Sequence, residues 1–220
     1  MSRHLFVIEG TDGSGKSTQA ALTARALQQN GVDFTRLTFP RYQEESSALL
    51  RMYLRGDFGS QPGDVNPYAA STFFAVDRYA SFKTGWQRDW EAGKLIFCDR
   101  YTTSNAVHQS SKLPEGELEP FTRWLFDYEY NLLGLPAPTC VVFLDLPPEV
   151  SFKMLEKRQG ESGDIHELDH GYLRECYRRA LRICELEGWH RVPCAEKGVI
   201  RPPEDINRDI LAILKEELAR

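Results

Sequence analysis

One short segment restricts the possible folds of this chain more than any other, the eight residues 10–17. They read Gly-Thr-Asp-Gly-Ser-Gly-Lys-Ser and match the pattern G-x-x-x-x-G-K-[ST] at every fixed position. An apolar run of strand length, residues 5–8, comes before the segment, and a helix-forming stretch, 17–29, follows it. A loop of this type wraps a phosphate group between a strand and the first turn of a helix. The segment therefore predicts a phosphate-binding loop in an α/β fold.

The residue types in this loop account for its chemistry. Glycines let successive backbone N–H groups turn inward onto phosphate oxygens, and the helix N-terminus adds the positive end of its dipole. Lys16 reaches the outer phosphates, and the hydroxyl of Ser17 suits the coordination shell of Mg²⁺. The chain is thus predicted to bind a nucleoside triphosphate, ATP, through Gly10, Asp12, Gly13, Ser14, Gly15, Lys16, Ser17 and Thr18.

The composition excludes several other classes of protein. Of the 220 residues, 41% are hydrophobic and 27% are charged, as in a globular chain that buries a core. The net charge of −5 argues against a nucleic acid polymer as partner, because such proteins generally carry a basic excess. No run of about 18 apolar residues exists, so we expect no membrane helix. Strand pattern begins close to Met1 and the five cysteines form no C-x-x-C pair, so we expect no signal peptide and a cytoplasmic protein.

Short apolar runs alternate with helix-forming segments along the chain. Strands are predicted at 5–8, 34–39, 95–98, 141–144 and 189–192, the second and the last being the weakest. Helices are predicted at 17–29, 44–55, 67–91, 118–133, 147–158, 169–187 and 203–218. This alternation is typical of a parallel sheet that helices cover on both faces, with the ligand at the carboxyl ends of the strands. Because no linker or repeat interrupts the order, residues 1–220 are predicted to form one α/β domain.

Two further groups of residues are candidates for the same site. Asp99 and Arg100 directly follow an apolar run and should lie beside the loop, where a carboxylate can hold the Mg²⁺ shell and an arginine can bridge phosphates. A bound triphosphate would repel Asp12, which should face a metal ion or a sugar hydroxyl instead. Phe74 and Arg78 share a helix face, but this spacing alone more often reflects core packing.

Several motifs occur in an order that is much more specific than the loop alone. They are Ile8-Glu9-Gly10-Thr11-Asp12-Gly13-Ser14-Gly15-Lys16-Ser17-Thr18, Phe39-Pro40-Arg41-Tyr42, Phe74-Ala75-Val76-Asp77-Arg78, Asp99-Arg100-Tyr101 with Ser104-Asn105, and Gly134-Leu135-Pro136-Ala137-Pro138. With these motifs the chain resembles the thymidylate kinases, in particular bacterial ones, over nearly its whole length. The resemblance implies the three-layer α/β fold of P-loop nucleotide kinases, with a central parallel sheet of about five strands and helices on both faces. It also implies a homodimer.

The resemblance implies a set of acceptor contacts. The aromatic residue that stacks on thymine in this family corresponds to Phe74, and the arginine that reads the edge of the base corresponds to Arg78. The arginine after Phe-Pro, Arg41, would contact the monophosphate, and Arg100 would bridge the donor and acceptor phosphates. The implied dTMP-binding residues are Asp12, Phe39, Arg41, Tyr42, Phe74, Arg78, Arg100, Asn105 and His108.

The chain departs from the family pattern at two positions. Members with a basic residue inside the loop carry it where this chain has Gly13. The cation that meets the transferring phosphoryl group should then come from a mobile lid near 157–168, with Arg158 or Lys157 as candidates. The implied catalytic residues are Lys16, Arg100, Asp12 and Arg158. The family also tends to have tyrosine where this chain has His108, which leaves the selection of the sugar open.

The predicted reaction is the transfer of the γ-phosphoryl group of ATP to dTMP, which gives ADP and dTDP. Mg²⁺ is the expected cofactor, held by Ser17 and Asp99 directly or through water. One alternative is another deoxynucleotide or deoxynucleoside kinase, in which Glu9 or Asp12 would deprotonate a hydroxyl group. A second alternative is a switch protein that binds a nucleotide without phosphorylating a small molecule.

Overall fold

Five parallel strands form the centre of the structure. The computed structural model describes residues 3–159 and 169–219, without the side chains of residues 156–159. Within these ranges the sheet has the order β2-β3-β1-β4-β5, and every neighbouring pair is parallel. The strands are β1 (Leu5–Glu9), β2 (Phe34–Thr38), β3 (Leu95–Asp99), β4 (Cys140–Asp145) and β5 (His190–Pro193). The α/β fold with a five-stranded parallel sheet is therefore confirmed.

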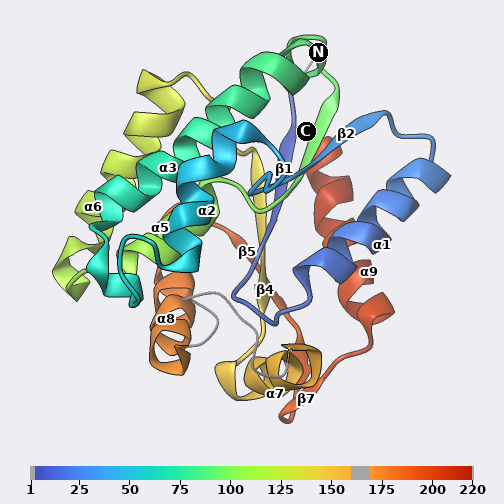
Figure 1. Cartoon of the computed structure of the whole chain (residues 1–220). Helices are drawn as coiled ribbons and strands as arrows, with labels where there is room; N and C mark the ends of the chain where they lie inside the picture. The colour runs from blue at the N-terminus through green and yellow to red at the C-terminus, as the bar shows by residue number, and fades with distance from the viewer. Residues whose placement is uncertain (1–2, 160–168, 220) are drawn as a thin grey trace.

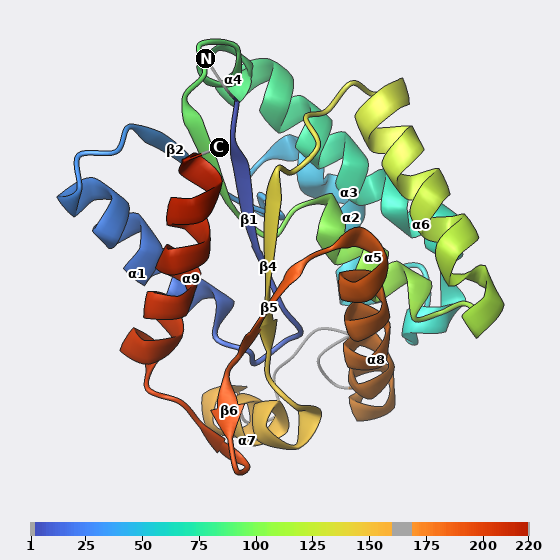
Figure 2. The same ribbon diagram turned by 180° about the vertical axis from the view of Figure 1, so that it is seen from behind.

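Helices cover both faces of this sheet (Figures 1 and 2). On one face lie α1 (Lys16–Gln29) and α9 (Pro203–Leu218). On the other face lie α2 (Ala48–Arg55), α3 (Pro67–Ser81), α5 (Thr102–Ser110), α6 (Leu118–Phe126) and α8 (His170–Glu187). Helix α4 (Gln87–Glu91) continues α3, and α7 (Pro148–Gln159) lies near the carboxyl ends of the strands. The result is a three-layer arrangement.

Side-chain alternation along the central strand explains the two cores. Leu5 and Val7 pack into the cluster that includes α5, α6 and α8, whereas Phe6 and Ile8 pack against α1 and α9. All five residues of β1 are buried, because a strand at the centre of a covered sheet has no solvent face. The edge strands β2 and β5 are partly exposed, which accounts for their weaker apolar pattern in the sequence.

The connection order places the phosphate-binding loop beside the end of β3. Strand β1 lies between β3 and β4, and Ile8 is paired with Asp99. The loop that leaves β1 and the chain that leaves β3 therefore emerge side by side at the carboxyl edge. This is the point where the strand order reverses, which is where open α/β sheets bind ligands.

The helices differ from the sequence prediction in detail. The predicted helix 67–91 consists of α3, a π-helical turn at Phe82–Trp86 and α4, and the predicted helix 118–133 consists of α6 followed by a π-helix at Asp127–Leu132. Helix α5 was not predicted as an element, and neither was the small hairpin of β6 (Ala195–Glu196) and β7 (Val199–Ile200). Short 3₁₀ turns occupy Glu45–Ser47, Pro62–Asp64 and Glu115–Glu117.

Two expectations drawn from composition can be compared with the structure. Within the described ranges, no helix combines the length and the apolar character that crossing a bilayer requires. All five cysteines carry free thiols and are buried, including Cys98 and Cys140 on the central strands. They act as small core residues.

Candidate active site

The phosphate-binding loop joins β1 to the first turn of α1, and its backbone requires glycine. Gly13 and Gly15 have φ angles of +79° and +87°, in the left-handed region that L side chains rarely adopt. A Cβ atom on Gly13 would lie 2.8 Å from the carbonyl oxygen of Ser151 and 3.0 Å from Cγ of Leu155, both on α7. The close approach of α7 therefore explains why this chain has no side chain at position 13.

Lys16 is the first residue of α1, and its ammonium group lies within the loop. Nζ donates to the carbonyl oxygens of Gly10 at 2.7 Å and of Thr11 at 2.8 Å, and it lies 3.7 Å from Oδ1 of Asp12. Burial, reinforced by the positive charge of Arg100, lowers the pKa of Lys16 to about 8. The carbonyl contacts hold the cation in place without neutralising it.

A cavity of about 570 Å³ opens in front of the loop. Gly13, Gly15, Lys16, Ser17 and Thr18 form one wall of this cavity, and Asp99 at the end of β3 forms another. Met154 and Leu155 of α7 and Thr38 also line it. Gly10 and Ser14 do not line the cavity. They shape the loop from behind, since Gly10 accepts from Lys16 and Ser14 is buried.

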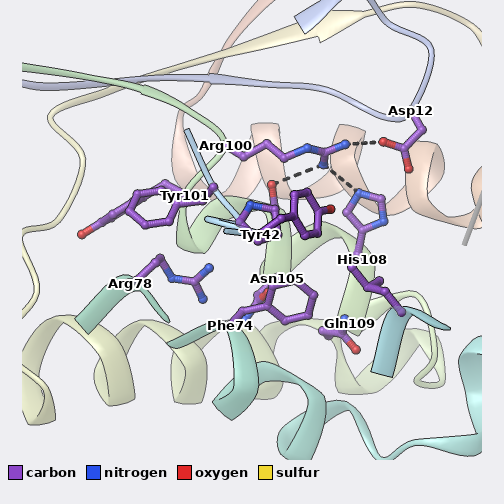
Figure 3. Close-up of a pocket in the computed structure, with 13 residues that line it drawn as sticks. Asp12, Tyr42, Phe74, Arg78, Arg100, Tyr101, Asn105, His108 and Gln109 are labelled. Carbon is purple, nitrogen blue, oxygen red and sulfur yellow. Dashed lines mark hydrogen bonds and ion pairs between the residues drawn. The ribbon is translucent and has the colours of Figure 1, made fainter. Parts of the chain in front are cut away.

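A second, smaller cavity of about 120 Å³ adjoins the first, between the ends of the strands and helices α3 and α5 (Figure 3). Five residues line both cavities, namely Asp12, Phe39, Pro40, Tyr42 and Arg100. The smaller cavity is further lined by Leu54, Phe74, Arg78, Tyr101, Ser104, Asn105, His108 and Gln109. It therefore combines aromatic rings with amide and guanidinium groups.

Arg100 stands at the boundary between the two cavities. Its φ of +66° is unusual for a residue other than glycine and costs about 1–3 kcal/mol, and such strain concentrates at functional sites. One terminal nitrogen forms a short ion pair with Asp12, and the other lies 3.3 Å from Nε2 of His108, 3.5 Å from Oγ of Ser104 and 3.9 Å from Oε1 of Glu9 (Figure 3). Burial opposes the charge of Arg100, but the negative charges of Asp12 and Glu9 raise its pKa.

The contact with Arg100 sets the tautomer of His108, and burial keeps its ring neutral. An arginine can only donate, so Nε2 of His108 must accept and its proton must be on Nδ1, which lies 3.5 Å from Sγ of Cys176. Burial, together with the positive charges of Arg100 and Lys16, lowers the pKa of His108 to about 4. His108 is therefore a neutral ring that lines the smaller cavity and contacts Arg100.

Helices α3 and α5 supply the wall of the smaller cavity that faces Arg100. Helix α3 begins at Pro67, where Asn66 caps the helix by accepting from the backbone N–H of Tyr68. One turn apart on this helix, Phe74 is half-buried and Arg78 is buried. The spacing of the two residues therefore reflects a shared cavity face.

Gln109 on α5 is a lining residue that sequence reasoning missed. Its side chain is 1% exposed, and its Oε1 has no hydrogen-bond partner within the described part of the chain. Asn105, one turn earlier on the same face, donates from Nδ2 to the carbonyl oxygen of Ser71 at 3.2 Å. A buried amide oxygen without a partner is energetically costly. The spacing i, i+4 from Asn105 was the available signal.

Comparison with known proteins agrees with this geometry. Residues 8–201 match the family model for thymidylate kinase. The chain belongs to the thymidylate kinase family. A thymidylate kinase of Mycobacterium tuberculosis is 30% identical over 88% of this chain and 86% of the relative. A probable thymidylate kinase of Pyrococcus abyssi is 30% identical over 99% of this chain and 98% of the relative, and a thymidylate kinase of Leptospira borgpetersenii is 29% identical over 86% and 89%. Relatives thus come from bacteria and from an archaeon.

Arg41, which the resemblance predicts to bind the acceptor, lies outside both cavities. Nε of Arg41 donates to Oδ1 of Asp77 at 3.3 Å, its backbone N–H donates to Oδ2 at 2.9 Å, and Nη2 donates to Oγ of Ser46 at 3.0 Å. Asp77 is buried on α3 and holds the guanidinium away from the smaller cavity. In this position Arg41 lines neither cavity.

The lid expected in this family falls mostly outside the described residues. Residues 157 and 158 lie at the end of α7, but the side chains of Lys157 and Arg158 and the whole of residues 160–168 lie outside the description. Sequence reasoning also did not assign the contacts of Glu9, Ser104 and Glu129 with Arg100 or Arg78. Glu129 is 51 residues from Arg78 in the chain, so no local pattern could have found it.

Proposed function

We propose that this chain transfers the γ-phosphoryl group of ATP to dTMP, with ADP and dTDP as products. The observation that carries the proposal is the pair of adjoining cavities with Asp12 and Arg100 lining both. One cavity has a phosphate-binding loop and the other has the groups that a nucleobase needs. A protein that only binds a nucleotide would not need the second cavity, so this arrangement favours transfer between two ligands.

On the donor side, ATP binds in the larger cavity. The loop N–H groups from Gly13 onward and Lys16 receive the phosphates, while Gly10 and Ser14 shape the loop. The Ser17 hydroxyl and the Asp99 carboxylate both line this cavity and are the hard oxygen ligands that Mg²⁺ prefers, so they would hold the ion directly or through water. Bound Mg²⁺ supplies positive charge to the phosphates.

On the acceptor side, dTMP binds in the smaller cavity. Phe74 stacks on the base, while Arg78, Asn105 and Gln109 face its polar edge. Phe39 and Tyr42 close the side shared with the donor cavity. Asp12 and His108 lie on the sugar side, and Arg100 contacts the phosphates of both substrates. Arg41, which is paired with Asp77, contacts the monophosphate, as the resemblance implies.

No protein base is required for this reaction. The attacking oxygen of a monophosphate is already anionic near neutral pH, so catalysis consists of positioning and charge stabilisation. A nucleoside kinase would need a free carboxylate near the acceptor. Glu9 does not suit that role, because its oxygens accept from Thr103 at 2.8 Å, Ser104 at 2.7 Å and the N–H of Gly10 at 2.9 Å. Asp12, the other candidate base, forms an ion pair with Arg100. The contacts of both carboxylates support a monophosphate as acceptor.

The proposal includes further features that rest on the family resemblance. Arg158 is the lid cation that meets the transferring group, within a lid near 157–168, and the enzyme is of the bacterial type and homodimeric. Two more features rest on the sequence pattern and composition, namely a single domain and a cytoplasmic location.

A ranking of acceptors tests the proposal. The kcat/KM values for ATP-dependent transfer are measured with dTMP, dUMP, UMP, CMP and thymidine. We expect dTMP first and dUMP lower by about tenfold or more, the scale of one missing methyl group in a fitted pocket. UMP and CMP should be poor and thymidine inert. If CMP or thymidine ranks first, or if no monophosphate is phosphorylated, the proposed function is wrong.

A further inference from the structure

A fully buried ion pair lies behind the smaller cavity. Nε of Arg78 donates to Oε2 of Glu129 at 2.7 Å, and Nη2 donates to Oε1 at 2.5 Å. The two side chains are 2% and 0% exposed. A side-on pair of this kind, with two parallel hydrogen bonds, fixes the plane of the guanidinium group as well as its position.

Glu129 is itself held rigidly. Its Oε2 also accepts from Oγ1 of Thr102 at 2.6 Å, and its backbone carbonyl accepts from the N–H of Leu135 at 3.0 Å. It belongs to the π-helix Asp127–Leu132, a rare conformation that is frequent at functional sites. Glu129 therefore ties the base-facing arginine of α3 to the start of α5, two residues after Arg100.

The pairing with Glu129 uses only some of the five N–H donors of Arg78. Nε and Nη2 donate to Glu129, and within the described residues Nη1 donates no hydrogen bond. Figure 3 shows the guanidinium group extending into the cavity between Tyr101 and Phe74. The edge that faces the cavity can only donate, because arginine has no acceptor atom.

We propose that Glu129 is a positioning residue that makes the acceptor site selective between pyrimidine bases. A fixed, donor-only edge matches the carbonyl oxygen at position 4 of thymine or uracil. Cytosine carries an amino group there, so two donors would face each other in a buried site and neither would be satisfied. Glu129 prevents the guanidinium from turning away to relieve this conflict. The inference rests on the proposed function and names a residue that sets its specificity.

The test compares Glu129→Gln with the wild-type enzyme in steady-state kinetics with dTMP and dCMP. Glutamine keeps the shape of the side chain but offers only one acceptor atom to the guanidinium. We expect KM for dTMP to rise about tenfold, kcat and KM for ATP to change much less, and the preference for dTMP over dCMP to fall by about tenfold. Glu175→Gln is the matched control, because Glu175 accepts from the buried Arg179 at 2.6 Å on α8 and lines neither cavity. It should lower thermal stability without changing the preference.

A second variant covers the case in which Glu129→Gln does not fold. Thr102→Val removes one hydrogen bond to Glu129 and keeps the volume of the side chain, so it should shift the base preference in the same direction by a smaller factor. A folded variant with wild-type KM for dTMP and unchanged base preference would overturn this inference but leave the proposed function standing. Parallel changes in kcat and both KM values, shared by Glu175→Gln, would also overturn it, because they indicate a general structural role. A wild-type enzyme inactive with every monophosphate would overturn the proposed function and this inference together.

Discussion

The two adjoining cavities are built in opposite ways. The larger one depends on a continuous stretch of chain, residues 10–18, and on backbone groups whose direction glycine permits. The smaller one is assembled from side chains of β-strand ends, α2, α3 and α5, with Glu129 behind it. Phosphates look alike in every nucleotide and can be bound by backbone N–H groups, whereas a particular base requires particular side chains at fixed positions.

This difference predicts that substitutions on the two sides have separable effects. A change in the loop should reduce transfer with little effect on acceptor binding. A change on α3 should weaken acceptor binding with little effect on the donor side. Arg100 and Asp12 are the exceptions, because they line both cavities.

The largest effect is expected for Lys16→Ala. In the proposed function Lys16 is the cation that contacts the outer phosphates, and removal of one such charge contact should lower kcat by a factor on the order of 10² to 10³ or more. Single-turnover transfer rates check this, with circular dichroism for the fold and calorimetry for dTMP affinity, which should change little. Lys215→Ala, an exposed lysine on α9, is the control. Near-normal turnover in a folded Lys16→Ala variant would contradict the assignment of the larger cavity as the ATP site.

A smaller effect, confined to the other cavity, is expected for Phe74→Ala. Loss of the stacking ring should weaken dTMP binding by about 1–3 kcal/mol and leave ATP affinity unchanged. Phe73→Ala is the matched control, since Phe73 packs on Tyr53 and Phe58 and does not line the cavity. Calorimetry with each ligand measures both affinities. Equal losses for ATP and dTMP would mean that Phe74 is a core residue and that the two sides are not separable.

The smallest effect concerns the pH dependence of ATP binding. Burial and the charge of Arg100 lower the pKa of Lys16 to about 8, and bound phosphates should raise it again. Above pH 8 binding must therefore take up a proton, and Kd for ATP should rise with pH by less than about tenfold per unit. Lys16→Met should remove this dependence in titrations from pH 7 to 9.5, while the Kd for dTMP should not follow it in either protein.

The same pKa shift predicts a change of opposite sign in stability. Between pH 8 and 10.5 the unfolded chain binds more protons at Lys16 than the folded chain, so this group contributes a free energy of unfolding that rises with pH. The difference in unfolding free energy between wild type and Lys16→Met isolates that contribution. A difference that does not vary over this range would show that the pKa of Lys16 is not lowered.

Much of the fold could be predicted from the sequence because its signals are local. Each central strand is an unbroken apolar run, and the loop motif fixes the connection from β1 to α1. The π-helical turns at Phe82–Trp86 and Asp127–Leu132 were not predicted, because a π turn differs from an α turn by one residue in the hydrogen-bond pattern and leaves little trace in composition. Helix α5 was not predicted because almost all its residues are polar although they are buried, so no apolar period marks the helix in the sequence.

The candidate site likewise has features that local sequence predicts and features that depend on tertiary packing. The sequence by itself determined the phosphate-loop motif and the α/β architecture. Through resemblance it also named residues on α3 and α5 that line the smaller cavity. Only the tertiary structure decided that Arg41 is held by Asp77, that Gln109 lines the smaller cavity and that Glu129 fixes Arg78. The reason is physical. Backbone recognition is set by neighbours in the chain, whereas a buried side chain takes its partner from whichever distant element packs against it, and that choice exists only in the folded protein.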